Sequence, residues 1–142
     1  MSESLSPRLS AIVDALPLSE GLRVLEIGCG PGAAAREVAR RIGTGHVMGI
    51  DRSGAAIGTA VAGSESLIAS GVLSFRQVAI EEFTLDPTDV PFDLAYAVRV
   101  GALDGRHPEI ETEALRRIAA ALTPSGRLFV DAGDPLREID LP

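Results

Sequence analysis

Three glycines, Gly28, Gly30 and Gly32, stand between an apolar run and a helical pattern in the stretch VLEIGCGPGAAAREVAR. Gly28 can make the sharp turn out of a strand, and Gly30 leaves room for a ligand against the backbone. Gly32 lets the next helix begin close to the sheet, and the amides at a helix N-terminus attract a carboxylate or a phosphate. The loop predicts a bound ligand, but it fits the dinucleotide spacing G-x-G-x-x-A as well as G-x-G-x-G.

Glu26 lies two residues before the first glycine, at the end of a run that is otherwise apolar. A buried carboxylate is unfavourable unless it is paired or hydrogen-bonded. A ligand with a positive charge near the strand end would satisfy Glu26, whereas a pyrophosphate would be repelled by it. The alternative is that Glu26 is bonded only to backbone amides or to an arginine.

Asp51 ends the next apolar run, HVMGID, roughly 20 residues after Gly32. A carboxylate at this place can accept both hydroxyls of a ribose. Its alternative role is to cap the helix that begins at Ser53, and the two roles are compatible. Asp51 therefore indicates a nucleoside without deciding which one.

These residues resemble a known family. VLEIGCGPG followed by GIDRS is similar to the class I S-adenosylmethionine-dependent methyltransferases, whose first motif is acidic-x-G-x-G-x-G and whose next strand ends in an acidic residue. The resemblance runs from about Leu5 to Asp131, and FDLAYAVRVGAL and ALRRIAAALTPSGRLFV also take part in it. It implies S-adenosyl-L-methionine as the cofactor and S-adenosyl-L-homocysteine as the product.

The resemblance also implies the cofactor site. Glu26 and the loop Gly28 to Gly32 would hold the methionine portion, Asp51 the ribose, and Arg52 or its neighbours the adenine. Residues from Val98 to Gly101 would line the side of methyl transfer. The full set of expected cofactor-binding residues is Glu26, Gly28, Cys29, Gly30, Pro31, Gly32, Asp51, Arg52, Ala79, Ile80, Glu81, Val98 and Arg99.

One departure from the family lies after the third expected strand. The family often has an acidic residue there that contacts the adenine amine, but in VAIEEF the matching position is Ala79. Glu81 or Glu82 could replace it from one turn away, or the backbone could make the contact.

The alternation of short apolar runs with helical periodicity predicts an α/β fold. We expect a doubly wound, mainly parallel, Rossmann-like sheet with helices on both faces. If the strand order is 3-2-1-4-5, the first strand flanks the point where the order reverses and ligands bind. One domain would cover residues 1–142, with an N-terminal helix cap over 1–20, capped by Ser6 before Pro7, and an unassigned tail over 132–142. The expected strands are LRVLEIG, HVMGID, VLSFRQVA, FDLAYAVRV and RLFVDAG.

The chain reaches only about eleven residues past the fifth expected strand, whereas the family fold usually continues through two more strands. We therefore expect a short form that lacks them. This would leave the edge of the fifth strand exposed, which proteins normally cover or pair. Three alternatives remain open: a homodimer or a partner chain covers the edge, the tail folds over it, or the sequence is a fragment.

The sulfonium methyl group that the resemblance implies is already activated, so transfer is an in-line displacement that depends on holding the acceptor close and excluding water. A base helps only where the acceptor must lose a proton. Asp104 and His107 are candidates to orient or deprotonate an acceptor, although a histidine before a proline at a helix start is often structural. Arg99 could bind an acidic acceptor or pair with Glu26 or Asp131.

Composition narrows the function class. The net charge of −7 argues against a nucleic-acid partner, and a single cysteine gives neither an internal disulfide nor metal-ligand spacing. No apolar run is long enough for a membrane span, so we expect a cytoplasmic enzyme with a small-molecule acceptor. The alternatives are a truncated or non-catalytic S-adenosylmethionine-binding module acting with a partner chain, and, more remotely, an NAD-dependent oxidoreductase, which Glu26 disfavours.

Overall fold

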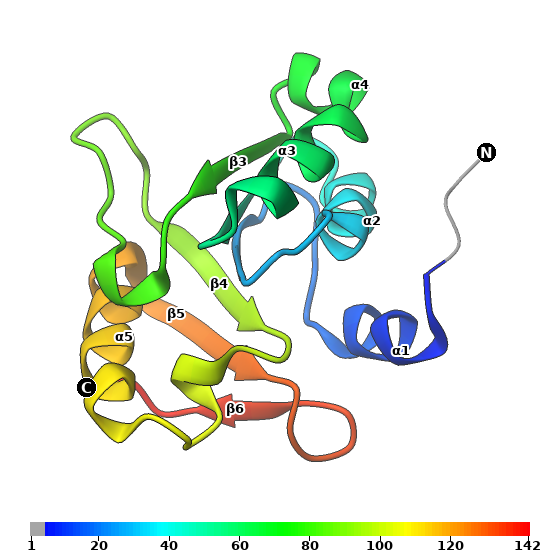
Figure 1. Ribbon diagram of the computed structural model, residues 1–142. Coiled ribbons are helices and arrows are strands. Elements are labelled where there is room, and N and C mark those ends of the chain that lie inside the picture. Colours follow the sequence, from blue (N-terminus) through cyan, green and yellow to red (C-terminus); the bar gives the residue numbers. More distant parts are fainter. Residues whose placement is uncertain (1–4) are drawn as a thin grey trace.

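The computed structural model describes residues 5–142, which form one six-stranded sheet with helices on both faces (Figure 1). The strand order is β3-β2-β1-β4-β5-β6, and every neighbouring pair is parallel except β5 and β6. The strands are β1 (Arg23–Ile27), β2 (His46–Asp51), β3 (Leu73–Gln77), β4 (Phe92–Ala97), β5 (Leu122–Val130) and β6 (Arg137–Ile139). The predicted doubly wound, Rossmann-like fold is confirmed, with the first five strands in the order 3-2-1-4-5.

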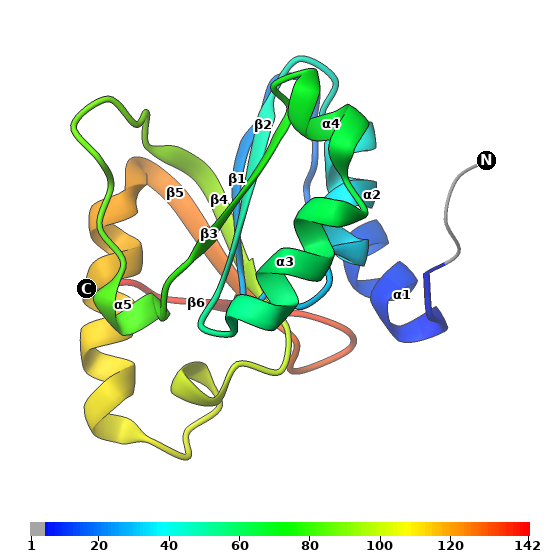
Figure 2. The same cartoon turned by 45° about the horizontal axis from the view of Figure 1, so that its top comes forward.

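The helices divide between the two faces of the sheet (Figure 2). One face carries α1 (Pro7–Ala15), α2 (Ala33–Arg41), α3 (Gly54–Ala62) and α4 (Glu65–Ala69), and the other carries α5 (Pro108–Ala121) with the 3₁₀ turns η1 (Ile80–Glu82) and η2 (Gly101–Leu103). The sequence accounts for the helix starts and breaks. At the start of α1, the Ser6 hydroxyl accepts a hydrogen bond from the Leu9 amide at 3.2 Å. Gly63 ends α3 and separates it from α4.

β1 lies in the middle of the sheet and is buried on both faces, so its side chains divide between two apolar clusters. Leu25 and Ile27 pack on the side of α5, whereas Val24 packs on the side of α1 and α2. Because side chains alternate along a strand, Glu26 points to the same side as Val24, beneath the layer of α1 and α2. The fold therefore places one carboxylate inside an apolar layer.

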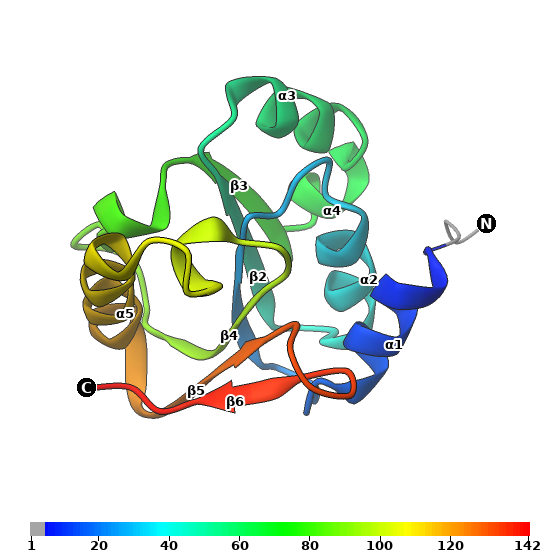
Figure 3. The same cartoon turned by 60° about the horizontal axis from the view of Figure 1, so that its bottom comes forward.

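The tail folds back along the sheet, which is the second of the three alternatives for the edge of the fifth strand. β6 runs antiparallel to β5, with Ile139 opposite Leu128 (Figure 3). The Arg127 guanidinium donates to both carboxylate oxygens of Glu138, at 2.8 and 3.1 Å. The edge at the carboxyl end of β5 is thus paired within the chain itself.

The start of β5 differs from the expectation. The expected strand RLFVDAG leaves out the segment TPSG, but this segment belongs to β5, which begins at Leu122 opposite Phe92 of β4. The next register pair is Leu94 with Arg127, so β5 carries extra residues between the two pairs. This bulge explains why a segment made of turn-forming residues lies within a strand.

We expect Ile139→Ser to lower the free energy of unfolding by about 1–2 kcal/mol, because Ile139 packs against the α5-side core and holds β6 on β5. Urea denaturation measures the change. Glu138→Gln is the matched control, because its side chain is exposed and its loss from the Arg127 pair should cause a smaller effect. An Ile139→Ser variant as stable as the wild type would show that β6 contributes nothing to the fold.

Candidate functional site

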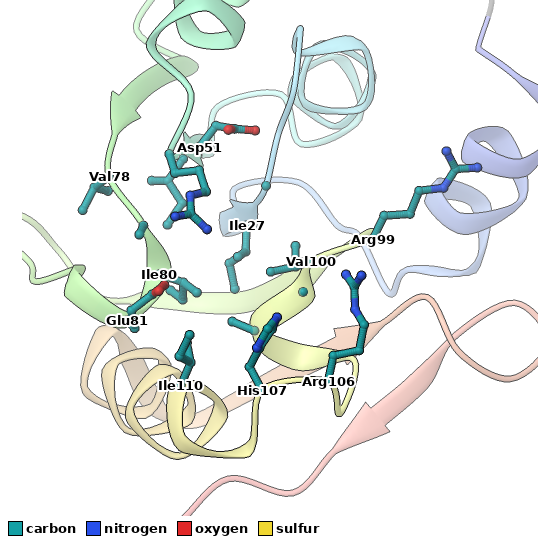
Figure 4. A pocket seen from close by; sticks show the side chains of 16 residues that line it. Ile27, Asp51, Val78, Ile80, Glu81, Arg99, Val100, Arg106, His107 and Ile110 are labelled. Carbon is teal, nitrogen blue, oxygen red and sulfur yellow. The ribbon is translucent and has the colours of Figure 1, made fainter.

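Two cavities open at the carboxyl ends of the parallel strands, where ligands bind in sheets of this kind. The first, the η1 cavity, has a volume of about 470 Å³ (Figure 4). It is lined by Ile27, Gly28, Ile50, Asp51, Arg52, Val78, Ala79, Ile80, Glu81, Arg99, Val100, Gly101, Ala102, Arg106, His107 and Ile110. The second, the glycine-loop cavity, has about 340 Å³ and is lined by Ser6, Arg8, Leu9, Glu26, Gly28, Cys29, Gly30, Pro31, Ala33, Ala34, Val98 and Arg99. Gly28 and Arg99 belong to both, so the cavities meet there.

The glycine loop makes its turn on residues with positive φ. Gly28 has φ of 71°, and a Cβ atom there would lie 2.7 Å from Cγ2 of Val100. Gly30 has φ of 54°, and a Cβ atom there would find nothing within 4 Å. Gly28 therefore permits a tight turn against Val100, while Gly30 leaves open space on the cavity side.

Gly32 is the one expected cofactor-binding residue that lines neither cavity. Its Cβ atom would lie 3.0 Å from Cζ of Phe75 and 3.1 Å from Cβ of Ala60. The missing side chain thus lets α2 begin close to β3 and α3, which agrees with the role in packing that its position in the loop predicts.

Asp51 joins the end of β2 to the glycine loop. Its Oδ2 accepts the Gly30 amide at 2.9 Å, and its Oδ1 accepts the Ser53 amide at 2.9 Å. The cap of α3 is Ser53, whose hydroxyl accepts the Ala56 amide at 3.1 Å. Because a carboxylate has about four acceptor sites, Asp51 can still accept hydroxyls from the η1 cavity that it lines.

Glu26 has the most unusual environment in the site. Its side chain is 2% exposed, and its Oε1 has no hydrogen-bond partner in residues 5–142. Burial raises the pKa of Glu26 to about 8. The negative charge of Asp51 also raises this pKa, whereas the neighbouring Tyr96 hydroxyl lowers it. One carboxylate oxygen at the wall of the glycine-loop cavity is therefore satisfied by neither a backbone amide nor an arginine.

Tyr96 lies opposite Glu26 in the β1–β4 register and is fully buried. Its hydroxyl likewise has no hydrogen-bond partner in the described chain, and burial together with Glu26 raises the pKa of Tyr96 well above its ordinary value. Cys29 is buried too, and burial raises the pKa of its thiol to about 12. Both groups are therefore neutral near pH 7, which leaves them as packing and polar neighbours rather than nucleophiles.

The far wall of the η1 cavity comes from the segment after β3. Val78, Ala79, Ile80 and Glu81 line it, and Figure 4 shows the Glu81 carboxylate beside Ile80 on this wall. Glu82 is exposed and is not part of the lining. Of the two glutamates that could replace the acidic residue missing at Ala79, the fold brings Glu81 to the cavity.

Arg99 lies just past the end of β4 in a left-handed conformation, with φ of 57°. It is exposed, so its charge is not buried in the apolar core. Its amide donates to Oδ1 of Asp131 at 3.1 Å, and its side chain points from the η1 cavity toward α1 (Figure 4). The guanidinium forms no ion pair with Glu26 or Asp131; Asp131 pairs instead with Arg8 of α1.

The two other catalytic candidates lie differently. Asp104 accepts the backbone amide of Arg106 at 3.1 Å and its Nε at 2.6 Å, which lowers the pKa of Asp104, and it lines a separate small cavity. His107 stands at the N-cap position of α5, and its ring points into the η1 cavity (Figure 4). Only His107 of this pair faces the larger cavity.

Arg106 and Ile110 also line the η1 cavity, and the sequence reasoning missed both. Both residues lie close to His107 in the sequence, at the start of α5, and this closeness could have indicated that they line the same cavity. In residues 5–142 there is no cluster of three or more histidine, cysteine, aspartate or glutamate side chains that could hold a metal ion. None of the helices in this part of the chain is long and apolar enough to cross a membrane.

Comparison with known proteins decides the family. A family model described as "Methyltransferase domain" matches residues 18–140. The chain belongs to this methyltransferase-domain family. The match extends from the segment before β1 through β6, so it includes the lining of the η1 cavity and all of the glycine-loop cavity except Ser6, Arg8 and Leu9.

An O-methyltransferase of Aspergillus nomiae is 31% identical over 98% of this chain and 58% of its own length. A trans-aconitate 2-methyltransferase of Paracidovorax citrulli is 33% identical over 87% of this chain and 43% of its own. The chain thus spans about half the length of the curated relatives that it matches. A methyltransferase structure from Thiobacillus denitrificans, in complex with S-adenosyl-L-homocysteine, superimposes with a TM-score of 0.67 at 24% identity, covering 92% of this chain and 50% of that one.

We predict that Glu26→Gln makes the protein more stable at pH 8 than the wild type, by on the order of a few kcal/mol. With a folded pKa of about 8 against an ordinary 4.5, folded Glu26 keeps a proton that the unfolded chain releases. The wild type should therefore lose stability as pH rises from about 4.5 to about 8, whereas the variant should not show this loss.

Urea denaturation at a series of pH values measures both slopes. Glu37→Gln is the control, because Glu37 lies on the surface of α2 and pairs with Arg41. If Glu26→Gln keeps the wild-type slope between pH 4.5 and 8, the Glu26 carboxyl is not held protonated by burial.

Proposed function

We propose that this chain binds S-adenosyl-L-methionine and transfers its methyl group to a small-molecule acceptor by in-line displacement. The observation that carries the proposal is Glu26, a buried carboxylate that lines a cavity and whose Oε1 has no hydrogen-bond partner among residues 5–142. A cationic ligand group would satisfy it. The amino group of the methionine portion is such a group, and the residues around the two cavities fit the rest of the molecule.

The proposed placement follows the two cavities. The glycine-loop cavity takes the methionine portion, with its ammonium at Glu26 and its carboxylate at the exposed guanidinium of Arg99. The η1 cavity takes the nucleoside, with the ribose at Asp51 and the adenine against Ile80 and its neighbours. The two portions join at Gly28, which lines both cavities and has no side chain of its own.

A dinucleotide fits the same loop less well. Its pyrophosphate would need the loop amides, but the Gly30 amide already donates to Asp51. The phosphates would also lie near the carboxylate of Asp51, which repels them, and near Glu26, which offers them no positive charge. Charge and hydrogen bonding therefore favour the sulfonium nucleoside over NAD.

When bound, S-adenosyl-L-methionine supplies a methyl group already activated by the sulfonium charge. The residues of this chain then have three tasks: to hold the donor through Glu26 and Asp51, to keep water from the junction at Gly28, and to orient the acceptor. No base is required for an anionic acceptor. His107, whose ring points into the η1 cavity, can accept a proton where the acceptor carries one.

A small-molecule acceptor is supported by the relatives. One is named for trans-aconitate, and another is an O-methyltransferase. The net charge of −7 and the single cysteine agree with a cytoplasmic enzyme that has no nucleic-acid partner. Because the chain spans about half of these relatives, the catalytic activity of the whole protein belongs to the proposal.

Isothermal titration calorimetry with S-adenosyl-L-homocysteine tests the binding. We expect micromolar or tighter binding by the wild type, and a loss of affinity of about tenfold in Asp51→Asn, which removes the charge-assisted bonds to the ribose. Asp86→Asn is the matched control, because Asp86 pairs with Arg76 and lines neither cavity.

Titration with NADH completes the test. Binding of NADH without S-adenosyl-L-homocysteine, or no binding of either, would refute the proposed function. Methyl transfer from the labelled donor to a panel of small acids and phenols then separates an enzyme from a non-catalytic binding module, which would bind the donor without turnover.

A further inference from the structure

The carboxylate of Asp131 joins three segments that are distant in the sequence. It lies directly after β5 and is largely shielded, with 16% of its side chain exposed. Its Oδ1 accepts the Arg99 amide at 3.1 Å, and its Oδ2 is paired with the Arg8 guanidinium in the first turn of α1. Figure 3 shows the segment after β5 next to α1, as this pair requires.

The first of these contacts supports a strained turn. Arg99 is the one non-glycine residue in the described part of the chain with positive φ, a conformation that side-chain-bearing residues rarely adopt. The hydrogen bond from its amide to Asp131 holds it there. The next residue, Val100, packs against Gly28: a Cβ atom added to Gly28 would lie only 2.7 Å from Cγ2 of Val100. The turn therefore sets the passage between the two cavities.

The second contact closes the glycine-loop cavity from the other side. Ser6, Arg8 and Leu9 from the start of α1 line that cavity. The Arg8–Asp131 pair ties this end of α1 to the end of β5. At the other end of α1, Asp14 pairs with Arg41 of α2 at 2.8 Å, so α1 is fixed at both ends by similar contacts.

From these contacts we infer that Asp131 is a positioning residue for the methyl donor: it fixes the Arg99 turn between the cavities and holds the first turn of α1 over the methionine portion. Asp131 lines neither of the two cavities and acts through Arg99 and Arg8. The inference rests on the proposed function, because it concerns the same donor.

Four variants separate the two roles. Arg8→Gln breaks the pair with Asp131, changes one residue of the glycine-loop cavity wall, and leaves the contact of Asp131 to the Arg99 amide intact. Asp131→Asn keeps an oxygen that can accept the Arg99 amide but loses the charge that attracts Arg8. Asp131→Ala removes both contacts. Asp14→Asn is the matched control, since it breaks the corresponding ion pair at the far end of α1.

The affinities for two ligands and the hydrogen exchange of the Arg99 amide distinguish these variants. S-adenosyl-L-homocysteine occupies both proposed cavities, whereas adenosine occupies only the η1 cavity. Arg8→Gln and Asp131→Asn should weaken S-adenosyl-L-homocysteine by about fivefold and leave adenosine unchanged. Asp131→Ala should weaken both ligands, S-adenosyl-L-homocysteine by about tenfold or more. Its Arg99 amide should exchange with deuterium faster, and Asp131→Asn should restore the protection.

The outcomes are distinct. A wild type that does not bind S-adenosyl-L-homocysteine refutes the proposed function itself. If the wild type binds but Asp131→Ala binds equally well, the role of Asp131 is refuted. Equal losses of affinity in Asp14→Asn and Arg8→Gln would also refute it, because they would show a general dependence on the stability of α1.

Discussion

The site depends on one buried carboxyl group. β1 lies inside the sheet and is buried on both faces. Near its carboxyl end it places Glu26 beneath a helical layer, and Oε1 of Glu26 has no protein partner in the described chain. Burial of such a group is unfavourable, and it shifts the carboxyl toward its protonated form, with a pKa of about 8. In the proposed complex, the ligand ammonium would supply the missing opposite charge and restore the ionised form. The same group would thus weaken the free protein and strengthen the complex.

The other elements are arranged around that group. The glycine loop brings the chain past Glu26 without side chains in the way, and Asp51 anchors the loop through the Gly30 amide. The turn at Arg99, held by Asp131, closes the gap to the η1 cavity. Residues from the ends of β1, β2, β4 and β5 meet at one edge because parallel strands end on the same side of the sheet. The site is therefore a product of topology more than of any single motif.

Local patterns in the sequence predicted much of this. The strands and the cap at Ser6 depend on neighbouring residues, so periodicity and residue type reveal them. Gly28 and Asp51 could be placed because the family motif fixes their spacing. The pairing of β6 with β5 could not, because a short polar tail has no clear period. Neither could the Arg8–Asp131 pair, since a contact between the two ends of the chain depends on the completed fold.

The titration of the Glu26 carboxyl tests the account most directly. Carbon-13 NMR of the labelled side-chain carboxyl can follow it in the free protein and in the complex with S-adenosyl-L-homocysteine. The account predicts a pKa near 8 in the free protein, and a value far below this in the complex, where the ligand ammonium stabilises the carboxylate. A pKa near the ordinary 4.5 in the free protein, or one that the ligand leaves unchanged, would contradict the central role of Glu26.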